Sequence, residues 1–196
     1  MQALNLVIWN KCPIPFPLGE EAGYGSDGQI FNISNDPEKV IKFSVLYEND
    51  IPLEQEWHRI DAVLSCLEQQ HPSACARVFR HEYITISKRA TFSGEQRYLL
   101  YYYLMEKCQK ISEDEKKVFH SILSHEDNNL IKDFSLDKIK EILNGLSTGL
   151  DFDYEMVIRF MEDIKDCPIN HNDLHQRNVM KNIDGFRLID FDRGTL

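Results

Sequence analysis

The stretch HNDLHQRNVM, residues 171–180, says more about the fold of this chain than any other part of the sequence. It gathers two histidines, an aspartate, an arginine and two asparagines, and it closes on an apolar pair. Asp173 and Asn178 stand five positions apart in this run, and a second acidic stretch with Asp190 follows. Aspartate can accept a proton from a hydroxyl group, and carboxylate and carboxamide oxygens suit Mg²⁺. These residue types raise the question of whether the two stretches form one reaction centre.

The composition is that of an ordinary globular protein with an excess of acidic residues. Apolar residues make up 42% of the 196 residues and aromatic residues 11%, enough for one sizeable core or two small lobes. The net charge of −10 argues against a nucleic-acid groove, because phosphate neutralisation requires clustered lysine and arginine. Any bound phosphate is expected to be held by a metal and by backbone N–H groups.

The sequence predicts neither a membrane span nor a secretory signal. The longest purely apolar run, Tyr98–Met105, is far shorter than the roughly 20 residues of a membrane helix. The N-terminal stretch lacks a basic segment followed by an apolar one. The five cysteines are scattered without a CxxC pair, which predicts neither a zinc site nor a disulfide framework. We therefore expect a soluble protein of a reducing compartment, the cytoplasm.

The first half of the chain predicts a small antiparallel sheet with one helix. Apolar residues recur at three and four positions over 52–70, the spacing of one helix face. Alternation and β-prone residues indicate strands on both sides of this helix. The predicted strands lie around 30–33, 40–43, 77–87 and 98–105, and the polar stretch 87–96 is expected to be a turn.

The second half predicts helices followed by a hairpin. Ser112 and Glu115 have capping-box spacing at the start of ISEDEKKVFHSIL, and Ser135 can cap LDKIKEIL. A third apolar stripe runs over 154–164. Beyond it, VMKNIDGFRLID predicts two short strands around an Asp184–Gly185 turn.

Gly23, Gly25 and Gly28 have the spacing G-x-G-x-x-G, which occurs in two kinds of nucleotide site. In the dinucleotide-binding fold the third glycine opens a helix. Here a strand pattern follows Gly28, and Lys42 stands in the next apolar strand. This arrangement favours a β-hairpin flap that covers phosphate groups with a lysine beneath it. The alternatives are that the glycines form a flexible turn and that Lys42 is an ordinary solvated strand lysine.

The order of these features resembles that of the protein-kinase-like superfamily. A glycine flap, a strand lysine, a helix with early acidic residues, an aromatic strand, helices, HNDLHQRN and LIDFD follow one another from about Gly19 to Arg193. The resemblance implies an α+β, bilobal protein-kinase-like fold. Its N-lobe, residues 1–107, would hold a small antiparallel sheet plus one helix. Its reduced, mainly helical C-lobe would comprise residues 108–196.

Within this family, one set of residues would bind ATP. The flap motif Gly-x-Gly-x-x-Gly-x-Val is matched at Gly23, Gly25, Gly28 and Ile30. Lys42 matches the lysine that binds the α- and β-phosphates, and Glu56 is its expected partner on the next helix, with Glu54 as the alternative. The hinge beside adenine is matched by Met105, Glu106 and Cys108. Taken alone, that last stretch would be plain core strand.

A second set would carry out the transfer. Asp173 matches the catalytic-loop aspartate that accepts or orients the acceptor hydroxyl, and Asn178 and Asp190 match the two protein ligands of Mg²⁺. His175 stands where protein Ser/Thr kinases carry lysine, and it would either contact the γ-phosphate or hold the loop in shape. The D-L-H sequence and Asp192, in place of the final glycine of D-F-G, are more typical of aminoglycoside and choline phosphotransferases.

The resemblance implies ATP- and Mg²⁺-dependent transfer of the γ-phosphoryl group to a hydroxyl. The complete glycine flap favours a protein serine or threonine as acceptor, and a small-molecule, sugar or lipid kinase is the alternative. A pseudokinase that only binds a partner is the third hypothesis, disfavoured because the lysine, the two aspartates and the asparagine are all present. An activation segment is not expected after LIDFD. This compactness resembles that of minimal kinases that some bacteria deploy as effectors inside host cells.

Overall fold

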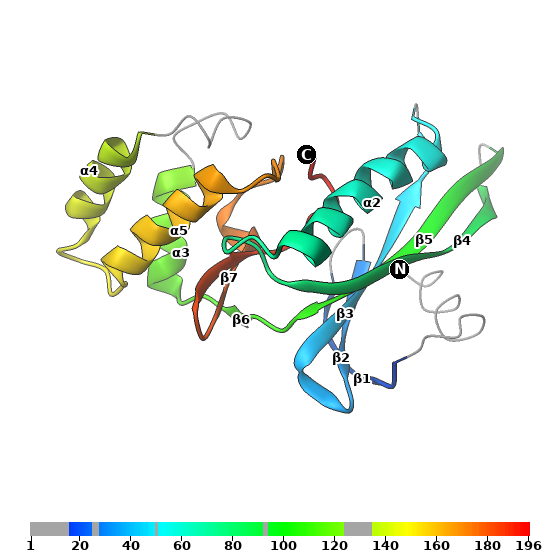
Figure 1. Cartoon of the computed structure of the whole chain (residues 1–196), viewed down its shortest axis with the longest axis horizontal. Helices are drawn as coiled ribbons and strands as arrows, with labels where there is room; N and C mark the ends of the chain where they lie inside the picture. The colour runs from blue at the N-terminus through cyan, green and yellow to red at the C-terminus, as the bar shows by residue number, and fades with distance from the viewer. Residues whose placement is uncertain (1–15, 25–27, 50, 92–93, 124–134) are drawn as a thin grey trace. The chain divides into compact units, whose positions relative to one another are not determined.

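The structure is a computed structural model that describes residues 16–24, 28–49, 51–91, 94–123 and 135–196. These residues form an α+β protein with a five-stranded antiparallel sheet, a three-stranded sheet and four α-helices (Figure 1). The chain divides into two compact units. The first ends at Glu68 and resumes over Val78–Lys107, and the second comprises Gln69–Arg77 together with Cys108–Leu196.

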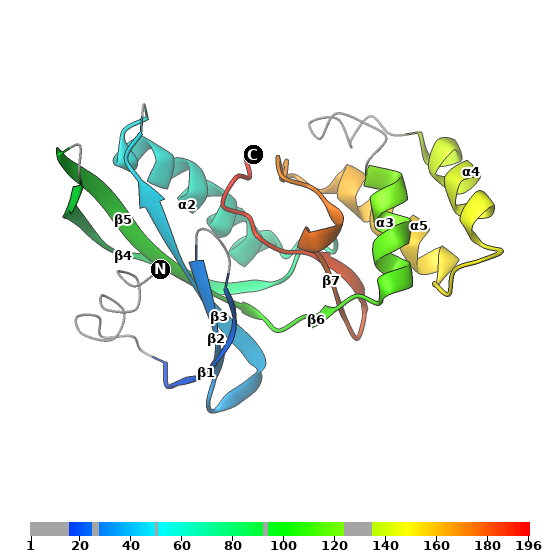
Figure 2. The ribbon, with the colours of Figure 1, turned by 180° about the vertical axis from the view of Figure 1, so that it is seen from behind.

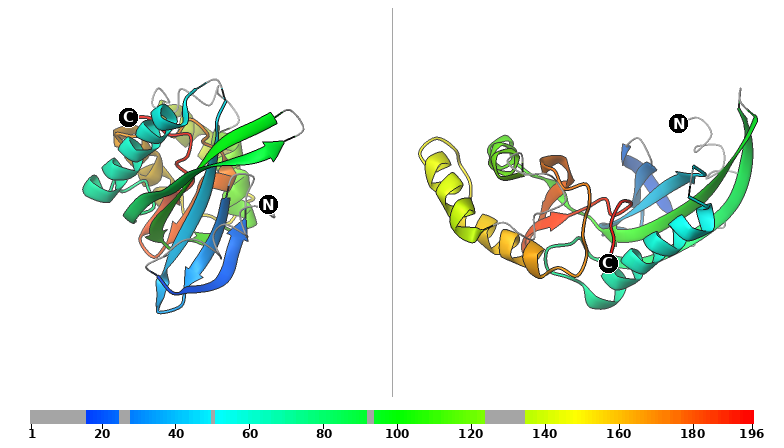
Figure 3. Two further views of the ribbon diagram at one scale, coloured as in Figure 1. Left: turned by 90° about the vertical axis from the view of Figure 1, so that its right-hand side faces the viewer. Right: turned by 90° about the horizontal axis from the view of Figure 1, so that it is seen from above.

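The first unit is built on the five-stranded sheet. Its strands are β1 (Leu18–Tyr24), β2 (Gly28–Ile33), β3 (Asp36–Tyr47), β4 (Val78–Thr91) and β5 (Gly94–Glu106), in the order β1-β2-β3-β5-β4. Every neighbouring pair is antiparallel. The long hairpin of β4 and β5 twists along its length, as paired strands of L-residues do (Figure 3).

The central position of strand β5 explains the longest apolar run of the sequence. The strand lies between β3 and β4, and it is buried on both faces. Tyr102 belongs to a cluster in which the rings of Phe31 and Phe43 meet edge to face at 6.0 Å. Tyr101 faces the other side, where its ring centroid lies 5.5 Å from that of Trp57. A strand buried on both faces needs apolar residues at consecutive positions, so period-two alternation is lost there.

Helix α2 (Leu53–Gln70) confirms the helix predicted over 52–70, with a start one residue later. Its buried side chains recur at helical spacing: Leu53, Ile60, Val63, Leu64, Cys66 and Leu67. Burying each large aliphatic side chain of this kind contributes about 1.5–3 kcal/mol. No helix in the described part of the chain, α2 included, is long and apolar enough to cross a membrane.

The strands of the first unit are longer than the sequence predicts. β3, β4 and β5 extend beyond their predicted apolar segments, and most of the polar stretch 87–96 is strand rather than turn. Polar residues can form strand here through cross-strand pairing: Lys88 and Glu95 are both exposed, and they pair across the hairpin at 3.0 Å. β1, with the sequence LGEEAGY, has no apolar alternation, and its structure comes from pairing with β2.

Within its described residues, the second unit combines three α-helices with a small sheet. The helices are α3 (Glu113–Leu123), α4 (Leu136–Leu146) and α5 (Tyr154–Asp166), and the short 3-10 helix η2 spans Gln176–Asn178. The sheet consists of β6 (Gln109–Lys110), β7 (Val179–Asn182) and β8 (Gly185–Leu188). Helices α3 and α5 lie side by side (Figure 2), and the rings of Phe119 in α3, Phe160 in α5 and Phe186 in β8 pack with centroids 4.8–5.7 Å apart.

The helices start where the sequence predicts, but only one of the two predicted serine caps forms side-chain capping hydrogen bonds within the described residues. Glu115 N–H donates to Ser112 Oγ (3.1 Å) and Ser112 N–H donates to Glu115 Oε2 (2.7 Å), which is the predicted capping box. Ser135 occupies the N-cap position of α4, but its side chain makes no capping hydrogen bond to the described residues of that helix. At α5, Asp153 Oδ1 accepts from Met156 N–H at 2.9 Å.

The hairpin turn between β7 and β8 lies one residue earlier than predicted. Asn182 pairs with Gly185, so the two loop residues are Ile183 and Asp184 rather than Asp184 and Gly185. Asn182 Oδ1 accepts from the N–H groups of Asp184 (2.8 Å) and Gly185 (3.1 Å) and closes the turn. Gly185 has a φ of 140°, which an L-residue rarely adopts, and this conformation lets it open β8.

The segment 69–77 packs with the second unit, although β4 follows it directly in the chain. Ala76 N–H donates to Leu188 O (2.8 Å), and Leu188 N–H donates to Ala74 O (2.7 Å). Cys75 Sγ lies 3.5 Å from Cys167 Sγ at the end of α5. A division of the chain at residue 107 alone therefore does not describe where this segment packs.

Candidate functional site

Asn178 holds residues 171–178 as a closed loop. Asn178 Nδ2 donates to the backbone oxygen of Asp173 (2.9 Å), and Asn178 N–H donates to that of His175 (2.9 Å). The residue is 6% exposed, so its carboxamide is held in one orientation. The hydrogen bond from Nδ2 leaves the oxygen Oδ1 as the atom that can serve as a ligand. The loop thus brings Asp173 and Asn178 together.

Asn178 also connects this loop to the acidic stretch after β8. Ile189 N–H donates to Asn178 O (3.0 Å), and His171 Nε2 donates to Ile189 O (2.7 Å). Asp190 follows directly and has a φ of 67°. A left-handed backbone costs an L-residue about 1–2 kcal/mol, and strain of this kind concentrates at functional sites. Backbone hydrogen bonds therefore join the loop that carries Asp173 and Asn178 to the segment that carries Asp190, within the second unit.

His171 positions the two joined segments. It is buried, and its ring meets that of Phe191 at a centroid distance of 5.7 Å. Burial lowers the pKa of His171 and outweighs the opposing effects of Ile189 O and the nearby carboxylates, so the imidazole is neutral at pH 7. Its Nδ1 is buried and has no hydrogen-bond partner in the described part of the chain. A histidine held in this way supports the loop rather than transferring a proton.

The carboxylate of Asp173 lies between two basic side chains. Its Oδ1 is 3.5 Å from Arg193 Nη1, and its Oδ2 is 4.0 Å from His175 Nε2. Arg177 N–H donates to His175 Nδ1 (3.2 Å), so in the neutral ring the proton sits on Nε2, on the side of Asp173. The Asp173 side chain is 31% exposed, which leaves room for a hydroxyl group. Both contacts are longer than an ordinary hydrogen bond.

Asn178 and Asp190 carry the types of oxygen donor that Mg²⁺ prefers. This ion keeps several waters and takes one or two protein oxygens together with phosphate oxygens. Asn178 and Asp190 each supply one oxygen donor of this kind, and Asp192 has a half-buried carboxylate two residues further on. The described residues contain no cluster of three or more His, Cys, Asp or Glu side chains arranged to bind a metal.

In the first unit, Lys42 and Gly28 lie against each other on neighbouring strands. Lys42 is 7% exposed, which excludes the alternative of a solvated strand lysine. Its Nζ lies 5.6 Å from the ring centroid of Tyr103. A Cβ atom on Gly28 would come within 2.3 Å of Phe43 O and 3.3 Å of Lys42 Cε. Gly28 is therefore the first residue of a strand, where close backbone approach excludes a side chain, and not part of a flexible turn.

The other predicted flap residues differ in how closely they are packed. Gly23 lies in β1 opposite Ile30 of β2, and a Cβ atom on Gly23 would meet nothing within 4 Å. Ile30 is half-buried and pairs with Lys42 across β2 and β3. Gly25 lies outside the described residues. The glycine spacing thus marks one sterically required position, Gly28, and one open position, Gly23.

The predicted hinge residues occur at the end of β5 and just beyond it. Met105 is buried and pairs with Val40. Glu106 is half-buried and is the last residue of β5. Cys108 is half-buried and belongs to the second unit. The predicted hinge therefore coincides with the passage of the chain from one unit to the other.

Both acidic residues in the first turn of α2 are engaged by arginines. Glu56 Oε1 accepts from Arg59 Nη2 (2.5 Å) and Nε (3.1 Å). Glu54 Oε1 accepts from Arg97 Nη2 at 2.8 Å. Pairing of Glu56 with Lys42, as expected from the family resemblance, would therefore require Glu56 to exchange or share its arginine partner.

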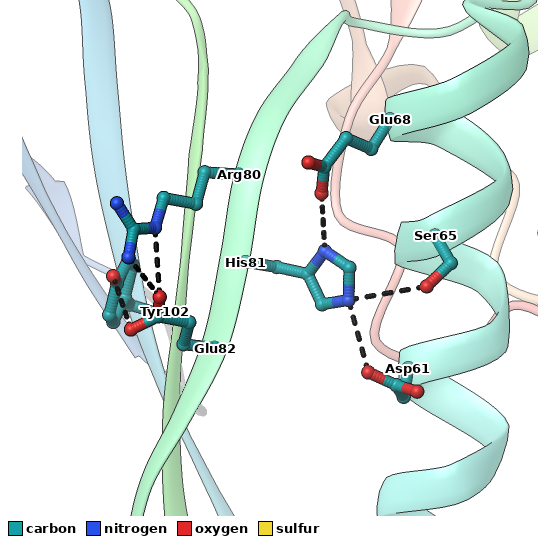
Figure 4. Close-up of polar contacts among 7 residues, drawn as sticks. All are labelled: Asp61, Ser65, Glu68, Arg80, His81, Glu82 and Tyr102. Carbon is teal, nitrogen blue, oxygen red and sulfur yellow. Dashed lines mark hydrogen bonds and ion pairs between the residues drawn. The ribbon is translucent and has the colours of Figure 1, made fainter.

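A polar cluster between β4 and α2 is absent from the sequence predictions. His81 points toward α2, with Nδ1 2.9 Å from Glu68 Oε2 and Nε2 3.1 Å from Asp61 Oδ1 (Figure 4). Ser65 Oγ lies 3.5 Å from the same Nε2. The available signal was the spacing of Asp61, Ser65 and Glu68, which puts three polar groups on one helix face. The cluster ties the helix to the sheet.

The residues on either side of His81 face away from α2. Arg80 and Glu82 form an ion pair there, and Tyr102 Oη donates to Glu82 Oε2 at 2.9 Å (Figure 4). Burial and the hydrogen bond to Glu82 raise the pKa of Tyr102 to about 12, so its hydroxyl stays protonated at physiological pH. This alternation of side chains is that of a β-strand, and it separates the Arg80 pair from the His81 cluster.

Comparison of the sequence with protein-family models gives no match, and comparison with curated proteins finds no relative. The kinase-like hypothesis therefore depends on the residues of this chain.

Proposed function

We propose that the protein is an ATP- and Mg²⁺-dependent phosphotransferase with a bilobal, protein-kinase-like fold. The observation that carries the proposal is the double connection made by Asn178, whose Nδ2 binds Asp173 O while its backbone oxygen accepts from Ile189 N–H. One buried residue thereby links a candidate base, Asp173, to a candidate metal ligand, Asp190. This is the arrangement that transfer of a metal-bound phosphoryl group requires.

In this reaction the acceptor hydroxyl loses its proton to Asp173. Its oxygen forms a bond to the γ-phosphorus, the bond from that phosphorus to the β,γ-bridging oxygen breaks, and ADP leaves with the bond's electron pair. Asn178 Oδ1 and the Asp190 carboxylate would hold Mg²⁺, which neutralises phosphate charge when bound. His171 keeps Asp190 in place through Ile189.

The first unit would supply residues that bind the nucleotide. Lys42 is buried on β3 and offers an ammonium group for the α- and β-phosphates. Gly28 lets β2 approach β3 closely, and with Gly23 it would let backbone N–H groups approach phosphate oxygens. The resemblance of Met105, Glu106 and Cys108 to a hinge supports adenine binding there.

A serine or threonine of a protein is the favoured acceptor, because the glycine motif is complete. A small-molecule, sugar or lipid hydroxyl is the second candidate, and two residues support it. His175 follows Asp173 at the position of the protein-kinase lysine, and Asp192 replaces the last glycine of D-F-G. Partner binding without catalysis is the third candidate.

Incubation with γ-labelled ATP and Mg²⁺ tests the proposal. For a protein acceptor, we expect label on protein bands when a cell lysate is added. For a small-molecule acceptor, we expect label on an alcohol when a panel of alcohols is added. Asp173→Ala and Asp190→Ala should each reduce labelling at least 100-fold, because each removes a base or a metal ligand. Arg177→Ala, on the same loop and exposed, is the matched control and should retain labelling.

The outcomes separate the three candidates. Transfer that survives both aspartate substitutions would contradict the assigned mechanism. Nucleotide binding without transfer to any acceptor or to water would favour the pseudokinase, and a wild-type protein that binds no ATP would refute the proposal.

A further inference from the structure

Arg193 lies beside the candidate base Asp173 and has no role in the reaction described above. We propose that Arg193 is an anion-binding residue that takes the γ-phosphoryl group of ATP beside Asp173. The inference rests on the proposed phosphotransferase function and adds a contact that distinguishes ATP from ADP.

The backbone of Arg193 is fixed by several hydrogen bonds. Gly194 N–H donates to Phe191 O (2.9 Å), which closes a tight turn around Arg193. Asn172 Nδ2 lies 3.1 Å from both Arg193 O and Thr195 Oγ1. Asn170 and Thr195 exchange two backbone hydrogen bonds, at 2.8 and 2.9 Å. The turn is therefore held against the loop that carries Asp173.

Asn172, whose side chain contacts Arg193 O and Thr195 Oγ1, has an unusual backbone conformation. Its φ is 55°, in the left-handed region that asparagine tolerates better than most L-residues. Asp190, which directly precedes the turn formed by residues 191–194, also has a positive φ. Residues with a left-handed backbone thus occur on both of the segments that meet at Arg193, as is common at functional sites.

The contact between Arg193 and Asp173 is too weak to contribute much to the stability of the fold, so stability does not explain why Arg193 is held in this position. Nη1 and Oδ1 are 3.5 Å apart, beyond the 2.7–2.9 Å of a strong charge-assisted hydrogen bond. The arginine side chain is 65% exposed, and ion pairs in such positions contribute little to folding. Among the described residues the guanidinium contacts only Asp173, which leaves most of its five N–H donors available for an incoming group.

A phosphoryl group is the anion that this position suits. During transfer the γ-phosphoryl group passes next to Asp173, whose negative charge repels it along with that of Asp190. A guanidinium 3.5 Å from Asp173 Oδ1 offsets this repulsion and presents a planar pair of donors to phosphate oxygens. His175, on the other carboxylate oxygen, offers only a single N–H at 4.0 Å.

Nucleotide binding to the full-length protein tests the inference without reference to the acceptor. Dissociation constants are measured by calorimetry with Mg²⁺ and either ADP or a non-hydrolysable imido analogue of ATP. We expect Arg193→Ala to weaken binding of the analogue about tenfold, which corresponds to about 1.4 kcal/mol, and to leave ADP binding unchanged. Arg193→Lys should recover part of the loss, and Arg177→Ala should change neither constant.

A second variant tests the positioning of Arg193. Asn172→Gly keeps the positive φ but removes the side chain that holds Arg193 O and Thr195 Oγ1. We expect an intermediate, several-fold loss of analogue binding with ADP binding retained. Unchanged ADP binding also shows that each variant is folded.

Two results would overturn the inference. Arg193→Ala that weakens both nucleotides equally would show a structural role, and Arg193→Ala that weakens neither would show no role in binding. In both cases the proposed function stands if the wild-type protein binds the nucleotides. A wild-type protein that binds neither nucleotide would overturn the proposed function and this inference together.

Discussion

At the scale of single residues, the glycine motif combines positions with different physical requirements. Gly28 has β3 so close that a Cβ atom would lie 2.3 Å from Phe43 O, whereas a Cβ atom on Gly23 would lie in open space. A spacing pattern treats these glycines as equivalent, but packing does not.

Substitution by alanine should separate the two glycines. Gly28→Ala is expected to lower the free energy of unfolding by about 1–3 kcal/mol, because a backbone oxygen cannot move aside without disturbing the sheet. Gly23→Ala, the control, should change it by no more than about 0.5 kcal/mol. Urea unfolding followed by circular dichroism measures both, and equal effects would show that Gly28 is not sterically required.

The two sides of β4 offer a second residue-scale comparison. His81→Leu should destabilise the protein by about 1–3 kcal/mol, because it removes two hydrogen bonds that join β4 to α2, each worth roughly 0.5–1.5 kcal/mol. Arg80→Ala on the opposite side removes a solvent-exposed ion pair and should change the stability much less. Thermal unfolding measures the difference, and a larger loss for Arg80→Ala would contradict the assignment.

At the scale of elements, helix α3 is joined to β7 through Glu115. Its Oε2 accepts from Ser112 N–H (2.7 Å), and its Oε1 accepts from Lys181 Nζ (2.7 Å). Burial opposes ionisation of Glu115, but these hydrogen bonds outweigh burial and lower its pKa below 4.5. The same carboxylate therefore caps a helix and binds the neighbouring sheet.

Glu115→Gln should lower the free energy of unfolding by about 1–3 kcal/mol at pH 7. A lowered pKa in the folded state gives stability that is fully present above pH 4.5 and is lost as the pH falls through the folded-state pKa. The difference between wild type and Glu115→Gln should therefore shrink below about pH 4.5. Glu113→Gln is the control, because Glu113 lies two residues earlier in the same helical turn and is 79% exposed. Its free energy of unfolding in urea should change little at any pH.

At the scale of the whole molecule, two compact units interleave along the chain. The first unit contains Phe43 in its core, and the second contains the cluster around Phe119. The segment 69–77 belongs to the second unit because Ala74 and Ala76 pair with Leu188.

Hydrogen exchange should reveal this division. Phe119→Leu removes aromatic contacts from the second core and is expected to accelerate exchange of the Ala76 and Leu188 amides together, by about tenfold for each 1.4 kcal/mol lost. Phe43→Leu, the matched change in the first core, should accelerate exchange in β3 and β5. It should accelerate exchange of the Ala76 and Leu188 amides much less. Exchange of Ala76 that follows β4 instead would contradict the grouping.

The sequence predicted well wherever one face of an element meets a core. Helix α2 and the capping box at Ser112 follow from spacing alone, because local geometry imposes a period on buried or capping residues. The juxtaposition of Asp173 and Asn178 also follows from short-range spacing. The polar end of the β4–β5 hairpin was missed because cross-strand pairing there involves residues with no apolar signal.

Local sequence patterns are enough to predict the α+β class, most helices and strands, and the residue types of the candidate site, because each depends on neighbours a few positions away. The contacts of Arg193 with Asp173, of His81 with α2 and of segment 69–77 with β8 could be found only from the folded chain. These contacts join residues distant in sequence. Many chain paths satisfy the same local periodicities, and the burial of two separate cores selects among them.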